Sequence, residues 1–186
     1  MSKRNTHYER AFEDLLQQRG IPYVAVDQAQ KAVFSGASIK SFDFIVYPNR
    51  GPKILADVKG RKCPWRQFQR GRWGETWITK DDLDGLHRWE EVFGPDYLAA
   101  FVFAYWLFDG DLPAQTNGAV HRFAQRDYAF VVAELTAYHL RSRCRSPRWH
   151  TVYVPAAKFG DLAQPLDLFL AGGQAGKCPQ KSPTGS

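Results

Sequence analysis

Two carboxylates and one lysine lie within two short apolar stretches of the chain. Asp57 and Lys59 are separated by one residue in the stretch 53–60, and Asp43 lies in the preceding stretch, 41–47. Side chains two positions apart in a β-strand point to the same face of the sheet, so Asp57 and Lys59 are predicted to lie side by side. Charged groups on a buried sheet cost folding free energy unless they pair or bind an ion. This cost indicates that the three residues serve a function.

The elements around these residues are predicted to place them on a β-hairpin that follows a helix. Both stretches are rich in Ile, Val, Phe and Tyr, and the Pro, Asn and Gly of residues 48–52 predict a turn between two antiparallel strands. Upstream, apolar residues recur at helical spacing over residues 6–19, ahead of Gly20. A short strand over residues 21–26 and a polar loop over residues 28–40 are predicted to connect this helix to the hairpin.

The rest of the chain is predicted to alternate helices and strands. A second helix begins at Thr79, carries Asp81 and Asp82 in its first turn and has an apolar stripe that we assign to the core alone. The continuous apolar run 97–108 is typical of a central strand that is covered on both faces. The remaining predicted elements are a loop over 109–125, a strand over 128–132, a short helix over 135–140, a strand over 149–154 and a helix over 156–170 that is broken at Pro165.

Length and composition predict one globular domain. The chain has 186 residues, of which 44% are hydrophobic and 15% aromatic, enough to bury a core without disulfides or a structural metal. We expect a single domain over residues 1–171 and, from its Gly, Pro, Ser and Lys content, a disordered tail over residues 172–186. The three cysteines have no paired spacing, and the sequence shows neither a signal peptide nor a membrane-spanning run. A cytoplasmic location is therefore expected.

Basic residues give the chain a net charge of +6 and a pI near 9.3, which favours a polyanionic partner such as nucleic acid. Directly after Lys59, residues 60–74 interleave basic and aromatic side chains among glycines and a proline, without a helical or strand period. Such a segment binds phosphates through its cations and stacks its rings on bases, or else its rings pack onto the core. The predicted nucleic-acid contacts are Arg61, Lys62, Trp65, Arg66, Arg70, Arg72 and Trp73. A second basic cluster, residues 141–148, is either another nucleic-acid contact or a solvated helix end.

The order of elements around the three charged residues resembles the PD-(D/E)xK nuclease superfamily. The shared features are a helix, a strand, a strand with Asp43, a strand with the Asp57-x-Lys59 motif, then a helix and a strand. The resemblance extends to the branch of Holliday junction resolvases, whose first helix carries a glutamate. Here the run Glu-Arg-Ala-Phe that begins at Glu9 precedes Gly20 at the spacing of that branch. The resemblance implies an α/β, restriction-endonuclease-like core: a central mixed β-sheet flanked by helices, in the order α-β-β-β-α-β.

The resemblance also implies a site and a chemistry. It makes Asp43, Asp57, Glu9 and the backbone carbonyl of Val58 ligands of Mg²⁺ or Mn²⁺, and it makes Lys59 the catalytic lysine. Hard divalent cations prefer carboxylate oxygens, and a bound cation activates water for attack on a phosphodiester. Glu13 lies one helical turn after Glu9 and is the alternate helix ligand. In the superfamily a proline commonly precedes the first aspartate, whereas here Phe42 precedes Asp43.

The predicted function is therefore a metal-dependent DNA endonuclease. RNA is an alternative substrate, and cutting both strands of a symmetric substrate would favour a homodimer. Two other interpretations stay open. One is a nucleic-acid-binding module that has kept the fold and lost the chemistry, and the other is a protein-interaction domain whose basic aromatic segment contacts an acidic partner.

Overall fold

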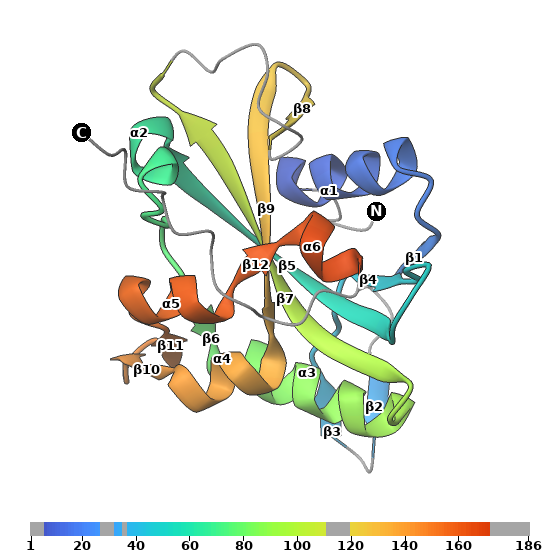
Figure 1. Cartoon of the computed structure of the whole chain (residues 1–186). Coiled ribbons are helices and arrows are strands. Elements are labelled where there is room, and N and C mark those ends of the chain that lie inside the picture. Colours follow the sequence, from blue (N-terminus) through green and yellow to red (C-terminus); the bar gives the residue numbers. More distant parts are fainter. Residues whose placement is uncertain (1–5, 27–31, 35–36, 111–119, 172–186) are drawn as a thin grey trace, which may run out of the picture.

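The computed structural model of the chain describes residues 6–26, 32–34, 37–110 and 120–171 (Figure 1). The predicted tail 172–186 and residues 111–119 of the predicted loop lie outside the described residues. No helix in the described part of the chain is long and apolar enough to cross a membrane.

A central mixed sheet has the strand order β1-β4-β5-β7-β9-β12, with β8 beside β9. The strands are β1 (Tyr23–Ala25), β4 (Phe44–Val46), β5 (Lys53–Pro64), β7 (Tyr97–Phe108), β8 (His121–Phe123), β9 (Arg126–Glu134) and β12 (Gln164–Pro165). Strands β5 and β7 pair in parallel over their whole length, from Lys53 opposite Tyr97 to Pro64 opposite Phe108. The neighbouring pairs described on either side are antiparallel, so the predicted mixed sheet is confirmed.

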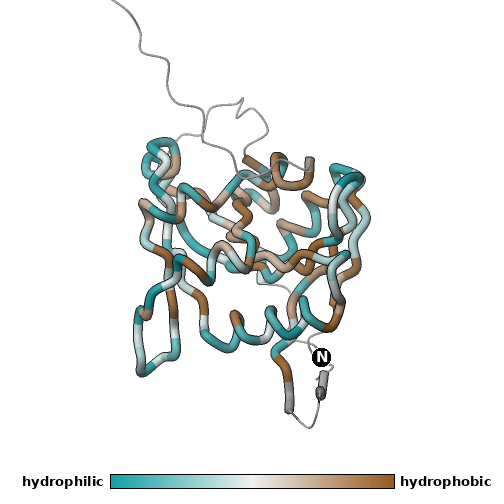
Figure 2. The backbone as a smooth tube through the Cα atoms, turned by 60° about the horizontal axis from the view of Figure 1, so that its bottom comes forward, coloured by the Kyte–Doolittle hydropathy of each residue, from teal (hydrophilic) through white to brown (hydrophobic). Residues whose placement is uncertain are grey.

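Helices cover both faces of this sheet (Figure 1). On one face α1 (His7–Gln18) and α6 (Leu166–Leu170) pack over the even-numbered residues of β5, which include Ala56 and Val58. On the other face α3 (Lys80–Phe93), α4 (Leu135–Arg141) and α5 (Ala156–Leu162) pack over odd-numbered residues such as Leu55. Hydrophobic and hydrophilic stretches alternate along the backbone, as Figure 2 shows, because each element turns one side to this core. The strand β5 is therefore buried between two layers of helices.

Two smaller sheets lie beside the central one. In the first, β10 (Arg143–Ser146), β11 (Thr151–Tyr153) and β6 (Ile78–Thr79) follow the order β10-β11-β6. The second is the hairpin of β2 (Ala32–Phe34) and β3 (Ala37–Ile39).

Most predicted elements are confirmed, and three segments differ from the prediction. The first helix, the β4–β5 hairpin, β7, β9, α4 and the break at Pro165 are all present. Residues 60–64 are part of β5, because parallel pairing with β7 keeps them extended, and residues 65–69 form the short helix α2 (Trp65–Gln69). The loops predicted over residues 28–40 and 109–125 contain the short strands β2, β3 and β8.

Candidate active site

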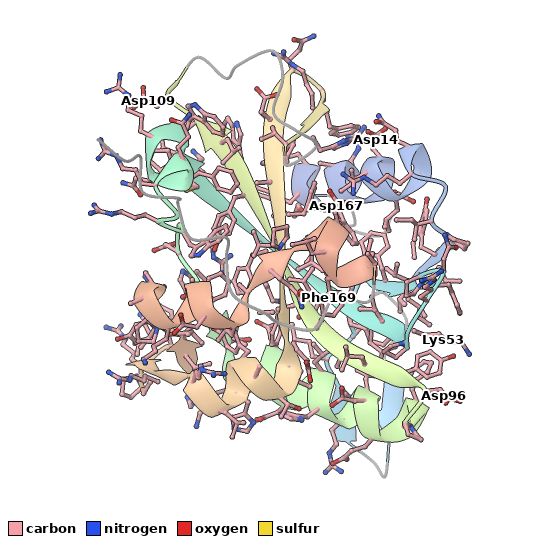
Figure 3. All side chains as sticks on the ribbon, in the orientation of Figure 1. Asp14, Lys53, Asp96, Asp109, Asp167 and Phe169 are labelled. Carbon is pink, nitrogen blue, oxygen red and sulfur yellow. The ribbon has the colours of Figure 1, made fainter. Side chains whose placement is uncertain are left out.

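Asp57 and Lys59 lie on the face of β5 that is covered by α3, at the middle of the central sheet. Figure 3 marks the two ends of the neighbouring strand β7, with Asp96 before it and Asp109 after it. The Nζ atom of Lys59 is 2.8 Å from Oδ2 of Asp57, so the predicted side-by-side arrangement is confirmed. Both side chains are almost fully buried, which distinguishes this ion pair from a solvated pair at a sheet edge.

Asp43 joins the site at the point where β4 begins. Its Oδ2 accepts a hydrogen bond from the backbone N–H of Val58 at 2.7 Å, and its own N–H donates to the carbonyl of Ala56 at 3.0 Å. In a longer β4 strand, a backbone carbonyl would accept the hydrogen bond from the Val58 N–H. Here the Asp43 carboxylate accepts that hydrogen bond instead. Because the N–H and C=O of one strand residue point to the same side, the Val58 carbonyl is directed to this edge as well.

Burial destabilises the charge of both aspartates. Burial raises the pKa of Asp43 well above its usual range, and repulsion from Asp57 and Glu9 adds to this increase. Burial also raises the pKa of Asp57, although Lys59 opposes the shift. The two carboxyl groups lie close enough to influence each other's pKa. A bound cation would offset the cost of keeping two carboxylates charged in this buried position.

Lys59 has a second partner that the sequence analysis missed. Its Nζ lies 3.0 Å from Oδ1 of Asp82, in the first turn of α3, and Lys40 also pairs with Asp82. Asp82 accepts from the N–H of Thr79 at 2.9 Å and donates its own N–H to the Thr79 hydroxyl at 3.1 Å, which is a capping box. The Thr79-x-x-Asp82 spacing reveals the cap, but no sequence signal shows that the same carboxylate reaches β5.

The electrostatics of this cluster fix the charge of the lysine. Burial lowers the pKa of Lys59, but the attraction of Asp57 and Asp82 outweighs burial and raises that pKa to about 12. For Asp82, burial raises the pKa, yet the two lysines and the Thr79 hydrogen bond bring the pKa well below its usual range. Lys59 is therefore a cation, and Asp82 an anion, throughout the neutral range.

The helix α1, on the other face of the sheet, brings Glu9 near Asp43. The hydroxyl of Thr6 donates to Oε1 of Glu9 at 2.9 Å, and the charge of Glu9 contributes to the raised pKa of Asp43. Glu13 instead accepts from the hydroxyl of Tyr23 at 2.8 Å, on the β1 side of the helix. The start of α1 packs closely against β5. The ring of Tyr8 lies so near Gly60 that a Cβ atom at position 60 would overlap it.

The donor set fits a hard divalent cation in part. Asp43 and Asp57 supply buried carboxyl oxygens, and the Val58 carbonyl is directed to the same edge. Within the described ranges, no three His, Cys, Asp or Glu side chains are gathered closely enough to form a ready-made metal cluster. Glu9 influences Asp43 electrostatically but does not complete such a cluster.

The predicted nucleic-acid contacts divide into exposed and packed residues. Lys62, Arg66, Arg70 and Arg72 are exposed. The Arg61 guanidinium is instead held inside the protein, where it donates to the carbonyls of Gly60 and Trp77 and lies over the Trp77 ring. Trp65 is buried, and Trp73 packs against Tyr105 and Phe159. For Trp65 the predicted stacking on bases is therefore wrong, because its ring belongs to the core.

The fold and this arrangement of side chains define an α/β protein with a restriction-endonuclease-like fold. The structure is similar to that of Hjc, a Holliday junction resolvase from the archaeal hyperthermophile Archaeoglobus fulgidus, with a TM-score of 0.51 and 14% sequence identity. The similarity covers 89% of this chain and 99% of the resolvase chain. No protein-family model and no curated protein matches the sequence. The structural similarity establishes the fold that the sequence predicted.

Proposed function

We propose that the protein is a metal-dependent nuclease that hydrolyses phosphodiester bonds in DNA. The observation that carries the proposal is the buried cluster of Asp43, Asp57 and Lys59 on adjacent strands of a restriction-endonuclease-like sheet. If the Asp57–Lys59 pair served stability alone, apolar side chains of similar size would serve as well, since a buried ion pair adds little net stability. The basic surface of the chain suits a phosphate backbone.

Each residue of the cluster has a defined part in this chemistry. Asp43, Asp57, the Val58 carbonyl and Glu9 would hold Mg²⁺ or Mn²⁺, which when bound activates water and neutralises charge on the phosphate. Lys59 carries a fixed positive charge because its pKa is about 12, so it stabilises developing negative charge and orients water rather than accepting a proton. Asp57 and Asp82 both pair with the Lys59 ammonium group and hold it in place.

Two contacts support Glu9 over Glu13 as the helix ligand in this proposal. Glu9 interacts with Asp43, whereas Glu13 is engaged by Tyr23. We therefore assign Glu9 to the metal and Glu13 to the packing of α1 on β1. The name of the similar resolvase makes a four-way DNA junction the first substrate to test.

The proposal is tested by incubating the protein with linear duplex, single-stranded and four-way DNA in Mn²⁺, Mg²⁺ or EDTA. We expect cleavage with either cation and none in EDTA. Asp43→Asn and Lys59→Met should each reduce cleavage at least 100-fold, the order of loss for a group that stabilises developing charge. Lys53→Met is the matched control, because Lys53 begins the same strand and lies over Tyr97, away from the cluster.

Thermal melting of each variant separates loss of chemistry from loss of folding. Binding of DNA without cleavage by the wild-type protein would favour the binding module over the enzyme. Undiminished cleavage by a folded Lys59→Met variant would overturn the mechanism.

A further inference from the structure

The β10–β11 hairpin, residues 143–153, is a basic and aromatic surface that the active site does not use. Arg143, Arg145 and Arg148 are exposed, and the ring of Trp149 at the turn is 69% exposed. Residues 135–160 contain no Asp or Glu, so the hairpin carries no acidic side chain of its own. Figure 1 shows β10 and β11 at a corner of the molecule, beside β6.

This hairpin is joined to the element that holds the catalytic lysine. Thr151 of β11 pairs with Thr79 of β6, and the carbonyl of His150 accepts from the N–H of Lys80 at 2.7 Å. Lys80 is the first residue of α3, and Asp82, two residues later, lies 3.0 Å from Lys59. The backbone at the hairpin tip is therefore fixed to the first turn of the active-site helix.

A second connection runs through Trp77. The guanidinium of Arg61, two residues after Lys59 on β5, lies 4.2 Å from the centre of the Trp77 ring, and that of Arg145 lies 5.0 Å from it. Arg145 also pairs with Glu75 at 3.1 Å. These contacts connect β10 to the active-site strand through the Trp77 ring.

The arginines on and near the hairpin differ in their contacts. Arg61 and Arg145 are structural, because both are occupied by Trp77 and by neighbouring acceptors. Arg143 and Arg148 are exposed, and Arg148 lies 5.3 Å from the centre of the exposed Trp149 ring. A guanidinium beside an exposed indole combines a phosphate contact with a stacking surface.

We propose that the β10–β11 hairpin is a nucleic-acid-binding arm of the active site. Arg143 and Arg148 contact phosphates of the strand that runs past α3, and Trp149 stacks on a base or sugar of that strand. The inference rests on the proposed nuclease function and extends it, because it states on which side of the site the nucleic acid continues. The charge of the hairpin and the exposed indole favour nucleic acid over an acidic protein surface.

The test measures the affinity for DNA separately from cleavage. Fluorescence anisotropy in Ca²⁺, which occupies oxygen sites, is recorded for labelled duplex and four-way DNA at several salt concentrations. Arg143→Gln/Arg148→Gln should weaken binding at least tenfold and reduce the slope of log K against log salt by about 2, one for each phosphate that the variant no longer neutralises. Trp149→Ala should weaken binding about fivefold or more. Arg50→Gln is the matched control: this exposed arginine lies in the β4–β5 turn and should leave the affinity unchanged.

The outcomes separate this inference from the proposed function. A wild-type protein that cleaves DNA, with an affinity that neither hairpin variant changes, overturns the arm and leaves the nuclease standing. A protein that binds DNA through the hairpin but does not cleave it overturns the nuclease and supports the arm. Polyglutamate that displaces DNA as effectively as unlabelled DNA of equal charge would overturn the assignment to nucleic acid.

Discussion

Lys59 on β5 and Asp82 in the first turn of α3 form a buried ion pair of 3.0 Å across the interface between sheet and helix. Asp82 is at the same time the capping residue that accepts from the N–H of Thr79. One carboxylate therefore fixes both the start of the helix and the orientation of the lysine. This relationship makes α3 a part of the site and leads to the first prediction.

Asp82→Asn should reduce DNA cleavage about 10- to 100-fold while the helix remains capped. The asparagine oxygen can still accept from Thr79, but the charge opposite Lys59 is lost, so the lysine is held by Asp57 alone. The pKa of Lys59 should also fall, since Asp82 contributes to its rise to about 12. The alkaline limit of the cleavage rate should then move to lower pH, which a purely structural role would not cause.

The control for this change is Asp81→Asn, which alters an exposed carboxylate in the same turn. We expect its rate and pH profile to match those of the wild type. If the two variants behave alike, Asp82 has no positioning role. Thermal melts of both variants establish that α3 is intact.

The backbone that carries the site could be predicted from local patterns, whereas its long-range partners could not. Alternation on β5 correctly placed Asp57 beside Lys59, and helical spacing correctly placed α1. Residues 60–64 lack a clear strand pattern because their extended form comes from parallel pairing with β7, more than 40 residues away in sequence. Asp82 is likewise accounted for locally as an acidic residue in the first turn of a helix, so nothing local indicated its contact with Lys59. The interior packing of Trp65 depends on the fold in the same way.

Asp43→Asn should stabilise the metal-free protein at neutral pH by about 1–3 kcal/mol, because it removes a buried charge beside Asp57. The folded-state pKa of Asp43 is raised above its unfolded value, so the folded protein binds the proton more tightly. The stability that the folded protein gains from this tighter proton binding is fully present below the unfolded pKa of Asp43 and is lost as the pH rises through the folded pKa. The advantage of the variant should therefore grow with pH across that window. Urea unfolding in EDTA at several pH values measures this difference, and an advantage that shrinks as the pH rises would refute it.

Glu9→Gln should weaken the binding of Mn²⁺ with little effect on the metal-free protein. Glutamine retains an oxygen that can accept from Thr6, but it lacks the negative charge of Glu9 that acts on Asp43. In the wild type, Mn²⁺ at 100 times its Kd should stabilise the fold by about 2.7 kcal/mol. At the same concentration the variant should gain at least about 1 kcal/mol less, as read from unfolding curves with and without metal.

Glu13→Gln provides the comparison for Glu9, since it lies one turn later on the same helix. Its carboxylate accepts from Tyr23, and glutamine retains an oxygen that can accept the same hydrogen bond, so the free energy of unfolding should change by no more than about 0.5 kcal/mol with or without metal. The stabilisation by Mn²⁺ should remain that of the wild type. The opposite result, in which Glu13→Gln removes the metal effect and Glu9→Gln does not, would exchange the two assignments.

Gly60→Ala should destabilise the protein by about 1–3 kcal/mol, because the added methyl group meets the ring of Tyr8 at the start of α1. The contact fixes the end of α1 that carries Glu9 against the strand that carries Lys59, so cleavage should decrease as well. A double-mutant cycle with Tyr8→Ala tests the cause: most of the penalty should disappear once the ring is absent. Gly160→Ala, on an exposed position of α5 where a methyl group meets Trp73 only at 3.4 Å, should be neutral or slightly stabilising. An unchanged penalty in the Tyr8→Ala background would mean that Gly60 is required for the conformation of β5 itself and not for the approach of α1.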